Sequence, residues 1–385
     1  MRTTRVRNVL PGLTLLWAAW APLRSQAGAD FYRFVAPSTT VVKSLSPSGT
    51  IVWSNAAVAV TGRFQKATVL TGTSNWADYV NCPVTGKMMT MRLFIPNAPT
   101  GMVLIPSGSF QMGNCMAPAE GDSDELPLHT VSVGSFYMDP CEVSKTQWNS
   151  VYSWALTHGY AFTNAGWGNG SNYPVAIVNW YDCVKWCNAR SEKEGRTPAY
   201  YTSAALTNVY RTGQLNLSNN WVRWDTGYRL PTEAEWERAA RGGAAGHRFP
   251  WSNADTIQHA RANYFSTNAL AYDTSPTRGY HPAYTNGGFH VSPVGCFAPN
   301  GYALYDMAGN VGEWCWDWYS DVYYASSPGS DPRGPLSGTD RLVRGGSWDY
   351  TADLSRVSFR DYQSPPYVDI TYMYVGFRTV FPLGP

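Results

Sequence analysis

The chain has 385 residues, which is too long for one small core and favours one large domain plus a smaller one. Its formal net charge is +2 and 15% of its residues are charged, so no basic surface points to nucleic acid. Its 17 Trp, 25 Tyr, 35 Gly and 26 Pro are typical of an ordered, loop-rich globular protein with few long helices.

Residues 1–27 have the pattern of a secretory signal peptide. A basic start (Arg2, Arg5 and Arg7) precedes an apolar run over 10–23, which is too short and too interrupted by proline to span a membrane stably. Small residues at 25–27 offer a cleavage site, and an uncleaved anchor is the alternative. No later apolar run is long enough to span, so we expect an exported protein, periplasmic or extracellular, without a membrane span in the mature chain.

The cysteine count is odd, which leaves at least one thiol unpaired within the chain even though export would permit disulfides. The 7 cysteines are Cys82, Cys115, Cys141, Cys183, Cys187, Cys296 and Cys315. Cys183 and Cys187 lie four residues apart on a predicted helix, but no second metal-binding pair matches them. We therefore expect core packing or separate disulfides there, and the pairing stays open.

Residues 29–97 alternate apolar and polar residues in short runs that are separated by turn residues such as those at 46–49 and 71–73. This pattern predicts a small accessory β unit of four to six strands. It contains no group of residues that suggests chemistry. The segment 96–101, with two prolines and a glycine, predicts the linker to a second domain over 102–381.

The second domain begins with strands. The segment 102–114 predicts a strand, a turn and a second strand, and 129–138 predicts two more. A helix is predicted to begin near Ser144, whose side chain can cap its first turn.

A strand followed by a second helix is predicted over 173–195, with Trp180, Val184 and Cys187 on one face. The segment 196–230 predicts a hairpin insert.

The clearest helix signal in the chain is RLPTEAEWERAARGG at 229–243. Pro231 suits a first helical turn, Thr232 and Glu235 suit a capping box, and the glycines at 242–243 end the helix. Beyond it the sequence predicts loops, aromatic clusters and short strands.

The run GYALYDMAGNVGEWCWDWY at 301–319 combines many aromatic rings with carboxylates. The rings are Tyr302, Tyr305, Trp314, Trp316, Trp318 and Tyr319, and the polar residues among them are Asp306, Asn310, Glu313 and Asp317. Rings at this density require a core, and carboxylates near a core require partners or a metal. Because Gly309 and Gly312 disfavour a regular helix, we interpret the run as an irregular segment around a cation.

Several motifs occur in an order that resembles the formylglycine-generating enzyme family, also called the sulfatase-modifying factor domain. They are MVLIPSGSFQMGN at 102–114, the helix motif at 229–243, FPW at 249–251, AN at 262–263, SPVG at 292–295, PNGYALYDMAGNVGEW at 299–314, LVRGGSW at 342–348 and VGFR at 375–378. The resemblance covers about 102–381. It implies an α+β fold, a C-type-lectin-like variant with little regular secondary structure.

The resemblance also implies a reaction, the oxidation of a sulfatase cysteine to formylglycine with oxygen and copper. The family holds copper with two cysteines just after the positions of Gly345-Gly346-Ser347. Here WDYTADLSRVSFRDYQSP follows and contains no cysteine, and its residues Asp349, Tyr350, Asp353 and Ser355 are hard or weak ligands. We therefore expect neither copper nor this activity, and we assign no catalytic residue. The 6 histidines show no paired helical spacing, which argues against the iron chemistry of other branches.

Two structural Ca²⁺ sites are implied by the resemblance. One would use oxygens of Asp306, Gly309, Val311 and Glu313, and the other those of Asn263, Tyr264, Asn286 and Gly288. Carboxylate and carbonyl oxygens are the ligands that Ca²⁺ prefers. The alternative is that Asp306 and Glu313 bond to loop amides or to Arg378.

A groove around the Gly345-Gly346-Ser347 turn is also expected, shaped for an extended peptide or a protein ligand. Its candidates are Ser347, Trp348, Tyr350, Arg360, Tyr362 and Arg378. Arg344, Arg356, Arg360 and Arg378 could bind such a ligand, but we favour pairing with Asp349, Asp353, Asp361 and Asp369. Glu233 and Glu237 share a helix face and could serve acid–base work, but we interpret them as part of a solvated, capped helix over a buried Trp236.

Two classes of function remain open. One is an oxidoreductase of this family with a changed, cysteine-free active site. The other is a binding or structural module that uses the lectin-like scaffold for recognition, and the accessory unit and export signal favour it. Fold alone does not decide between them.

Overall fold

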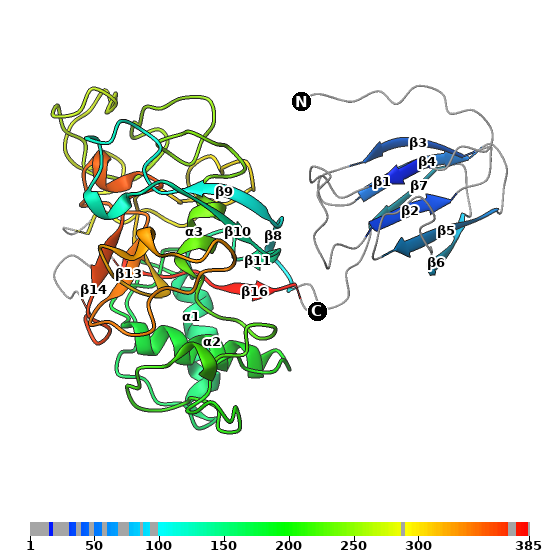
Figure 1. Cartoon of the computed structure of the whole chain (residues 1–385), viewed down its shortest axis with the longest axis horizontal. Helices are drawn as coiled ribbons and strands as arrows, with labels where there is room; N and C mark the ends of the chain where they lie inside the picture. Colours follow the sequence, from blue (N-terminus) through cyan, green and yellow to red (C-terminus); the bar gives the residue numbers. More distant parts are fainter. Residues whose placement is uncertain are drawn as a thin grey trace. The chain divides into compact units, whose positions relative to one another are not determined.

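The computed structural model describes the backbone of seven strands between residues 15 and 92 and, in full, residues 99–285, 289–368 and 375–383. The chain divides into two compact units, Met1–Asn97 and Ala98–Pro385 (Figure 1). Every helix in the described part of the chain is too short or too polar to cross a lipid bilayer.

The first unit consists of two antiparallel sheets, with strand orders β1-β2-β5-β6 and β3-β4-β7. Six of its strands fall within 29–97, and β1 lies within the predicted signal segment. The bounds are β1 Leu15–Trp17, β2 Phe31–Val35, β3 Thr40–Leu45, β4 Thr50–Asn55, β5 Val60–Ala67, β6 Ala77–Val84 and β7 Met88–Arg92.

The second unit contains three small sheets, with orders β10-β9, β16-β11-β8 and β14-β13-β12-β15. All pairs are antiparallel except β12 with β15. The bounds are β8 Val103–Ile105, β9 Gly108–Met112, β10 His129–Val133, β11 Phe136–Met138, β12 Gly312–Trp318, β13 Arg341–Arg344, β14 Asp361–Gln363, β15 Val375–Gly376 and β16 Val380–Pro382. The four predicted strands at 102–138 are confirmed, although β8 and β9 join different sheets.

Three α-helices complete this unit, and each begins where a side chain caps its first turn. They are α1 Lys145–Leu156 after Ser144, α2 Trp180–Lys193 after Asn179 and α3 Glu233–Ala240 after Thr232. The predicted starts at Ser144 and Thr232 are therefore confirmed. Short 3-10 turns lie at Ser123–Glu125, Asn219–Trp221, Tyr323–Ala325 and Ala352–Ser355.

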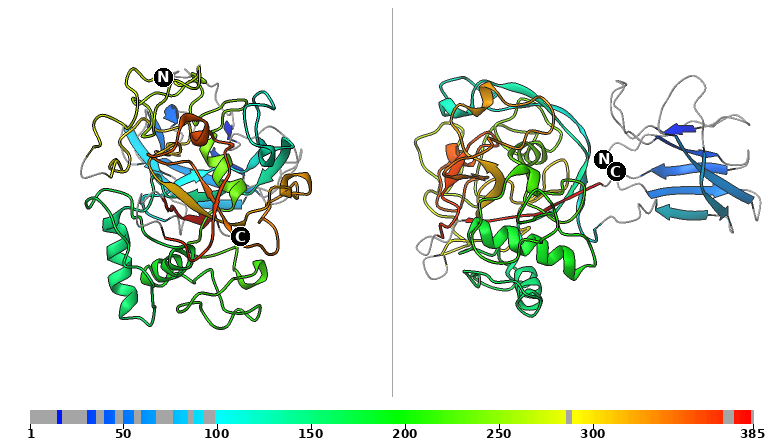
Figure 2. Two further views of the ribbon diagram at one scale, coloured as in Figure 1. Left: turned by 90° about the vertical axis from the view of Figure 1, so that its left-hand side faces the viewer. Right: turned by 60° about the horizontal axis from the view of Figure 1, so that its bottom comes forward.

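The core of the second unit is built from tryptophans. The rings of Trp148 in α1 and Trp186 in α2 stack 6.0 Å apart, and Phe377 meets both rings edge-on. This joins α1 to α2, which lie side by side in both views of Figure 2. A second cluster surrounds the buried Trp236 of α3, between β9, β10, β12 and β13.

Three local predictions need correction. Within the run at 301–319, Gly312–Trp318 is a fully buried strand, because β13 and β15 pair with it, although its register with β13 shifts between Trp314 and Trp318. Pro231 precedes the N-cap of α3 instead of lying in its first turn. The segment 196–230 forms isolated bridges rather than a hairpin.

Candidate functional site

The turn that precedes the predicted groove is made by Gly345 and Gly346. Their φ values are +97° and +71°, and a Cβ at Gly346 would lie 2.4 Å from the carbonyl oxygen of Leu354. Only glycine meets both the conformation and the close approach. The turn therefore directs the chain from β13 into the segment 348–365, where the resemblance led us to look for copper ligands.

Polar side chains of that segment form hydrogen bonds with other groups of the protein. The Tyr350 hydroxyl donates a hydrogen bond of 2.8 Å to Asp361 Oδ2, and the Tyr280 hydroxyl donates one of 2.8 Å to Asp349 Oδ1. Ser355 is buried, and its hydroxyl donates to the carbonyl of Thr351. Oxygen atoms, rather than thiolates, thus occupy this side of the turn.

An aromatic cluster lies beside the turn. Tyr280 stacks on His290 with ring centroids 3.8 Å apart, and Trp348 packs against both rings at 5.5 and 5.2 Å. The indole N–H of Trp348 is buried and has no acceptor among the described residues. Tyr280 and His290 could not be predicted as neighbours of Trp348, because they precede it by about sixty positions along the chain.

Most of the six groove candidates do not line a groove. Ser347, Trp348, Arg360 and Arg378 are at most 3% exposed, whereas Tyr350 is half-buried and Tyr362 is 46% exposed and stacks on Tyr319. Neither the cavity of about 200 Å³ nor that of about 20 Å³ contains any of the six. Only the two tyrosines remain accessible to a ligand.

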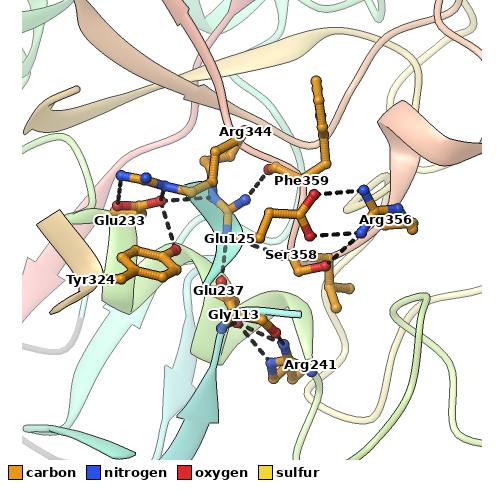
Figure 3. Close-up of polar contacts among 12 residues, drawn as sticks. Gly113, Glu125, Glu233, Glu237, Arg241, Tyr324, Arg344, Arg356, Ser358 and Phe359 are labelled. Atoms are coloured by element: carbon orange, nitrogen blue, oxygen red, sulfur yellow. Dashed lines mark hydrogen bonds and ion pairs between the residues drawn. The ribbon is translucent and has the colours of Figure 1, made fainter. Parts of the chain in front are cut away.

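The buried arginines contact buried glutamates, and Figure 3 shows Arg344 with Glu237 and Arg356 with Glu125. Arg344 lies between Glu237 and Glu233, and Glu237 also accepts hydrogen bonds from Arg241 and from the amide of Gly113. The interpretation of Glu233 and Glu237 as solvated residues is therefore wrong: they are at most 1% exposed.

Two further pairs extend this network. Arg360 contacts Glu233 at 2.7 Å, and Arg356 contacts Glu125 at 2.6 Å. Burial alone would raise the pKa of Glu125, but the hydrogen bonds and charge of Arg356 outweigh it and lower that pKa. The expected pairing of the arginines is correct in kind, but the partners are glutamates and, for Arg360, also Asp124 at 3.7 Å; they are not the side chains of Asp349, Asp353 or Asp361. Asp369 lies outside the described residues.

Asp306, the first predicted calcium ligand, lies beside a carboxylate that the sequence did not single out. Asp306 Oδ2 accepts a hydrogen bond of 2.6 Å from Gly295 N, and Glu142 Oε1 accepts one of 3.0 Å from Asn310 Nδ2. The second oxygen of each carboxylate is buried and has no hydrogen-bond donor among the described residues. Burial, and then the charge of Asp306, raise the pKa of Glu142 well above its usual range. Such a pair needs a cation or a shared proton.

Glu313 is already engaged. Arg378 contacts its two oxygens at 2.6 and 2.7 Å, and Trp236 Nε1 donates to one of them at 2.8 Å. This is the alternative that the sequence left open for Glu313. Gly309 and Val311 lie between Asp306 and Glu313 in the sequence, and Gly309 N donates a hydrogen bond to the carbonyl of Gly345.

The second predicted calcium site is described only in part. Asn263 is buried, and its Oδ1 has no donor among the described residues, while its Nδ2 donates to the carbonyl of His290. The Tyr264 carbonyl lies 3.1 Å from His259 Nε2. Asn286 and Gly288 lie outside the described residues. Within residues 99–285, 289–368 and 375–383, no three Cys, His, Asp or Glu side chains are grouped as a metal site, so backbone oxygens would have to complete either one.

The described cysteines are free thiols, and five of them lie in surroundings that favour the protonated form. Cys183, Cys187 and Cys315 are buried in the core, and burial raises their pKa values. Burial and the neighbouring Glu142 raise the pKa of Cys141 to about 12. Burial raises the pKa of Cys296 as well. Core packing of Cys183 and Cys187 is confirmed.

The comparisons with known proteins agree with the geometry. Residues 93–383 match the model of the sulfatase-modifying factor enzyme 1-like domain. The chain is 35% identical over 298 residues to the formylglycine-generating enzyme of Thermomonospora curvata, covering 72% of this chain and 92% of that one. It is 34% identical over 282 residues to the serine/threonine-protein kinase pkn1 of Chlamydia pneumoniae, covering 72% of this chain but only 37% of the kinase.

A solved structure shares the fold. Treponema denticola variable protein 1 superimposes with a TM-score of 0.54 at 28% identity, over 73% of this chain and 94% of that one. The α+β fold expected from the resemblance is thus confirmed. This chain belongs to the sulfatase-modifying factor family, the family of the formylglycine-generating enzymes.

Proposed function

We propose that this protein is an exported, calcium-stabilised ligand-binding member of the family that does not convert cysteine to formylglycine. The observation that supports this most directly is the segment after Gly345-Gly346-Ser347. It has no cysteine, and the side chains of Tyr350 and Asp349 are hydrogen-bonded to Asp361 and Tyr280.

The donors in that segment do not suit copper in the family's manner. A soft Cu(I) ion prefers thiolate or thioether ligands, and the segment offers phenol, hydroxyl and carboxylate oxygens. The chain's other thiols do not replace them. Cys141 and Cys296 lie near Glu142 and Asp306, whose negative charges disfavour a thiolate.

Calcium suits the residues better. The unpaired oxygens of Asp306 and Glu142 are hard ligands in a buried place at the first site, and the unpaired side-chain oxygen of Asn263 is a hard ligand at the second. Glu142, rather than Glu313, would be the second carboxylate ligand, because Arg378 neutralises Glu313. Backbone carbonyls near Gly309 and Val311 would complete the set. Bound calcium would stabilise the turns that carry the aromatic cluster.

The ligand surface of this proposal is the edge strand β14. In the described part of the sheet, β14 has a strand neighbour on one side only, and Tyr362 at its centre is 46% exposed. An extended peptide can add to such an edge through its main chain while aromatic side chains hold it. Relatives of comparable identity include a protein kinase as well as formylglycine-generating enzymes, so membership of the family does not fix the activity.

The test is an assay for formylglycine. The copper-loaded protein is incubated with oxygen and a peptide that bears a sulfatase-type cysteine motif, and mass spectrometry measures the aldehyde. The Thermomonospora curvata enzyme serves as the positive control. We expect no aldehyde. Turnover by the wild type that is lost in the double variant Cys141→Ser/Cys296→Ser would show that these two cysteines supply the thiolates that hold copper. Turnover that persists in this variant would show a cysteine-free reaction; either result refutes the proposal.

Export and calcium have their own measurements. Export is supported by the basic and apolar pattern of residues 1–27 alone, and N-terminal sequencing of the protein recovered from periplasm or medium tests it. A mature chain that begins at or near residue 28 is expected, and a chain retained inside the cell with Met1 intact would refute it. Elemental analysis of the same sample should find calcium and no copper.

A further inference from the structure

A cavity of about 200 Å³ lies away from the turn at Gly345 and shares no residue with the sites described above. Its wall is formed by the start of β11, the first turn of α3, the segments at Trp224 and Arg229, and the loop 331–333. This volume holds several water molecules and therefore a small organic molecule.

The hydrogen-bonding capacity left in this cavity belongs to donors. Arg229 is 4% exposed and binds Glu235 through both terminal nitrogens at 2.6 and 2.7 Å, but its Nε has no partner. Arg333 lies with its guanidinium 4.1 Å from the centroid of the Trp224 ring and makes no hydrogen bond or ion pair with any described residue. Burial, and then the charge of Arg229, lower the pKa of Arg333, as expected for a cation held near another cation.

The acceptors of the cavity are already used. Glu235 accepts both bonds from Arg229 and a third from the amide of Thr232. Asp331 accepts a hydrogen bond of 2.8 Å from the amide of Gly134. Because Nε of Arg229 is itself buried, an entering ligand meets the free N–H groups of Arg333 beside the apolar face of Trp224.

We propose that this cavity binds a small monocarboxylate, with its oxygens on Arg333 and its apolar part toward Trp224. Guanidinium groups bind carboxylates with two parallel hydrogen bonds where the geometry allows. Arg229 is already paired with Glu235, so Arg333 alone is left to balance an entering anion, and its single positive charge suits a monoanion better than a phosphate dianion.

The experiment is calorimetric titration of the full chain with sodium propionate, against sodium chloride at the same ionic strength. Arg333→Met keeps an unbranched side chain over Trp224 and removes the charge. Because Arg333 is only partly buried and has no ion pair, this variant should keep the melting temperature of the wild type. Arg223→Met is the matched control, since Arg223 is an exposed arginine near the Tyr201 ring and outside the cavity.

We expect Arg333→Met to weaken propionate binding at least tenfold, the loss typical of one charged hydrogen bond, and Arg223→Met to leave it unchanged. Propionate that binds Arg333→Met as tightly as the wild type would overturn the proposal. So would phosphate that binds more tightly than propionate, or an intact chain that binds neither. None of these outcomes depends on the formylglycine assay.

Discussion

Replacing Arg378 by methionine should be among the most damaging single changes in this domain. Arg378 is fully buried, contacts both oxygens of Glu313, and donates to the carbonyls of Asp139, Pro140 and Tyr305. Glu313 has no other ion-pair partner among the described residues. Methionine fills a similar volume, so the change removes the charge and the donors while leaving little cavity.

The expected loss in the free energy of unfolding depends on the charge that stays buried after the change. Removing one partner of a buried ion pair costs about 3–5 kcal/mol, because the other charge stays buried and uncompensated. Arg378→Met belongs at the upper end, about 5 kcal/mol, since the positive charge near Glu142 and Asp306 is lost as well. For a unit of this size that lowers the melting temperature by about 10 °C or more.

Arg344→Met is the matched comparison. It is equally buried, but its partners keep other cations: Glu237 keeps Arg241, and Glu233 keeps Arg360. We expect about 3 kcal/mol for it. Urea and thermal unfolding of both variants measure the difference, with Arg223→Met as an exposed control that should lie within about 0.5 kcal/mol of wild type. A loss below about 1 kcal/mol for Arg378→Met, or one no larger than that of Arg344→Met, would refute the reasoning.

Three further predictions concern pH, calcium and backbone strain. The pKa of Glu125 is lowered in the folded state, so its pairing with Arg356 stabilises the protein above the ordinary glutamate pKa, and this stabilisation is lost as pH falls through the folded value. The difference in urea midpoint between wild type and Glu125→Gln should therefore be largest near pH 7 and shrink below about pH 4.5. A difference that stays constant with pH would contradict this. Excess EGTA should lower the melting temperature, since a ligand at 100 times its dissociation constant adds about 2.7 kcal/mol to the free energy of unfolding. Asp306→Asn should abolish this effect of EGTA. An identical EGTA response in that variant would exclude Asp306 as a ligand. Gly346→Ala should destabilise more than Gly195→Ala in the same melts, because both have positive φ but only Gly346 approaches another backbone atom, and equal losses would contradict the steric argument.

Local features of the fold could be predicted from the sequence because local residues cause them. Ser144 and Thr232 begin helices because their side chains bond to amides three residues on, and the pattern is visible in any window of four residues. The turn at Gly345-Gly346 was found through the family resemblance. The strand β12 was missed, because pairing with β13 and β15 outweighs the glycine and aromatic pattern of its own segment.

The polar core could not be predicted, because its partners are far apart along the chain. Glu125 and Arg356 are separated by 231 positions, and Glu237 and Arg344 by 107. A glutamate on a capped helix has the same local pattern whether it faces water or an arginine from a distant strand. The sequence therefore identified the arginines as paired but assigned them neighbouring aspartates, and it did not find Glu142 beside Asp306.

The motifs that carry the family resemblance have structural reasons that do not involve chemistry. Gly346 is required because Leu354 passes close to it, and Arg378 joins Glu313 to carbonyls of two segments that lie far apart in the sequence, Asp139-Pro140 and Tyr305. A chain that lost either would lose packing or leave a buried charge, whatever reaction it performed. Their presence is thus evidence for the fold, while the reaction depends on the side chains just beyond the turn. In this protein those side chains supply oxygen atoms that are already hydrogen-bonded, and we therefore propose that it forms no formylglycine.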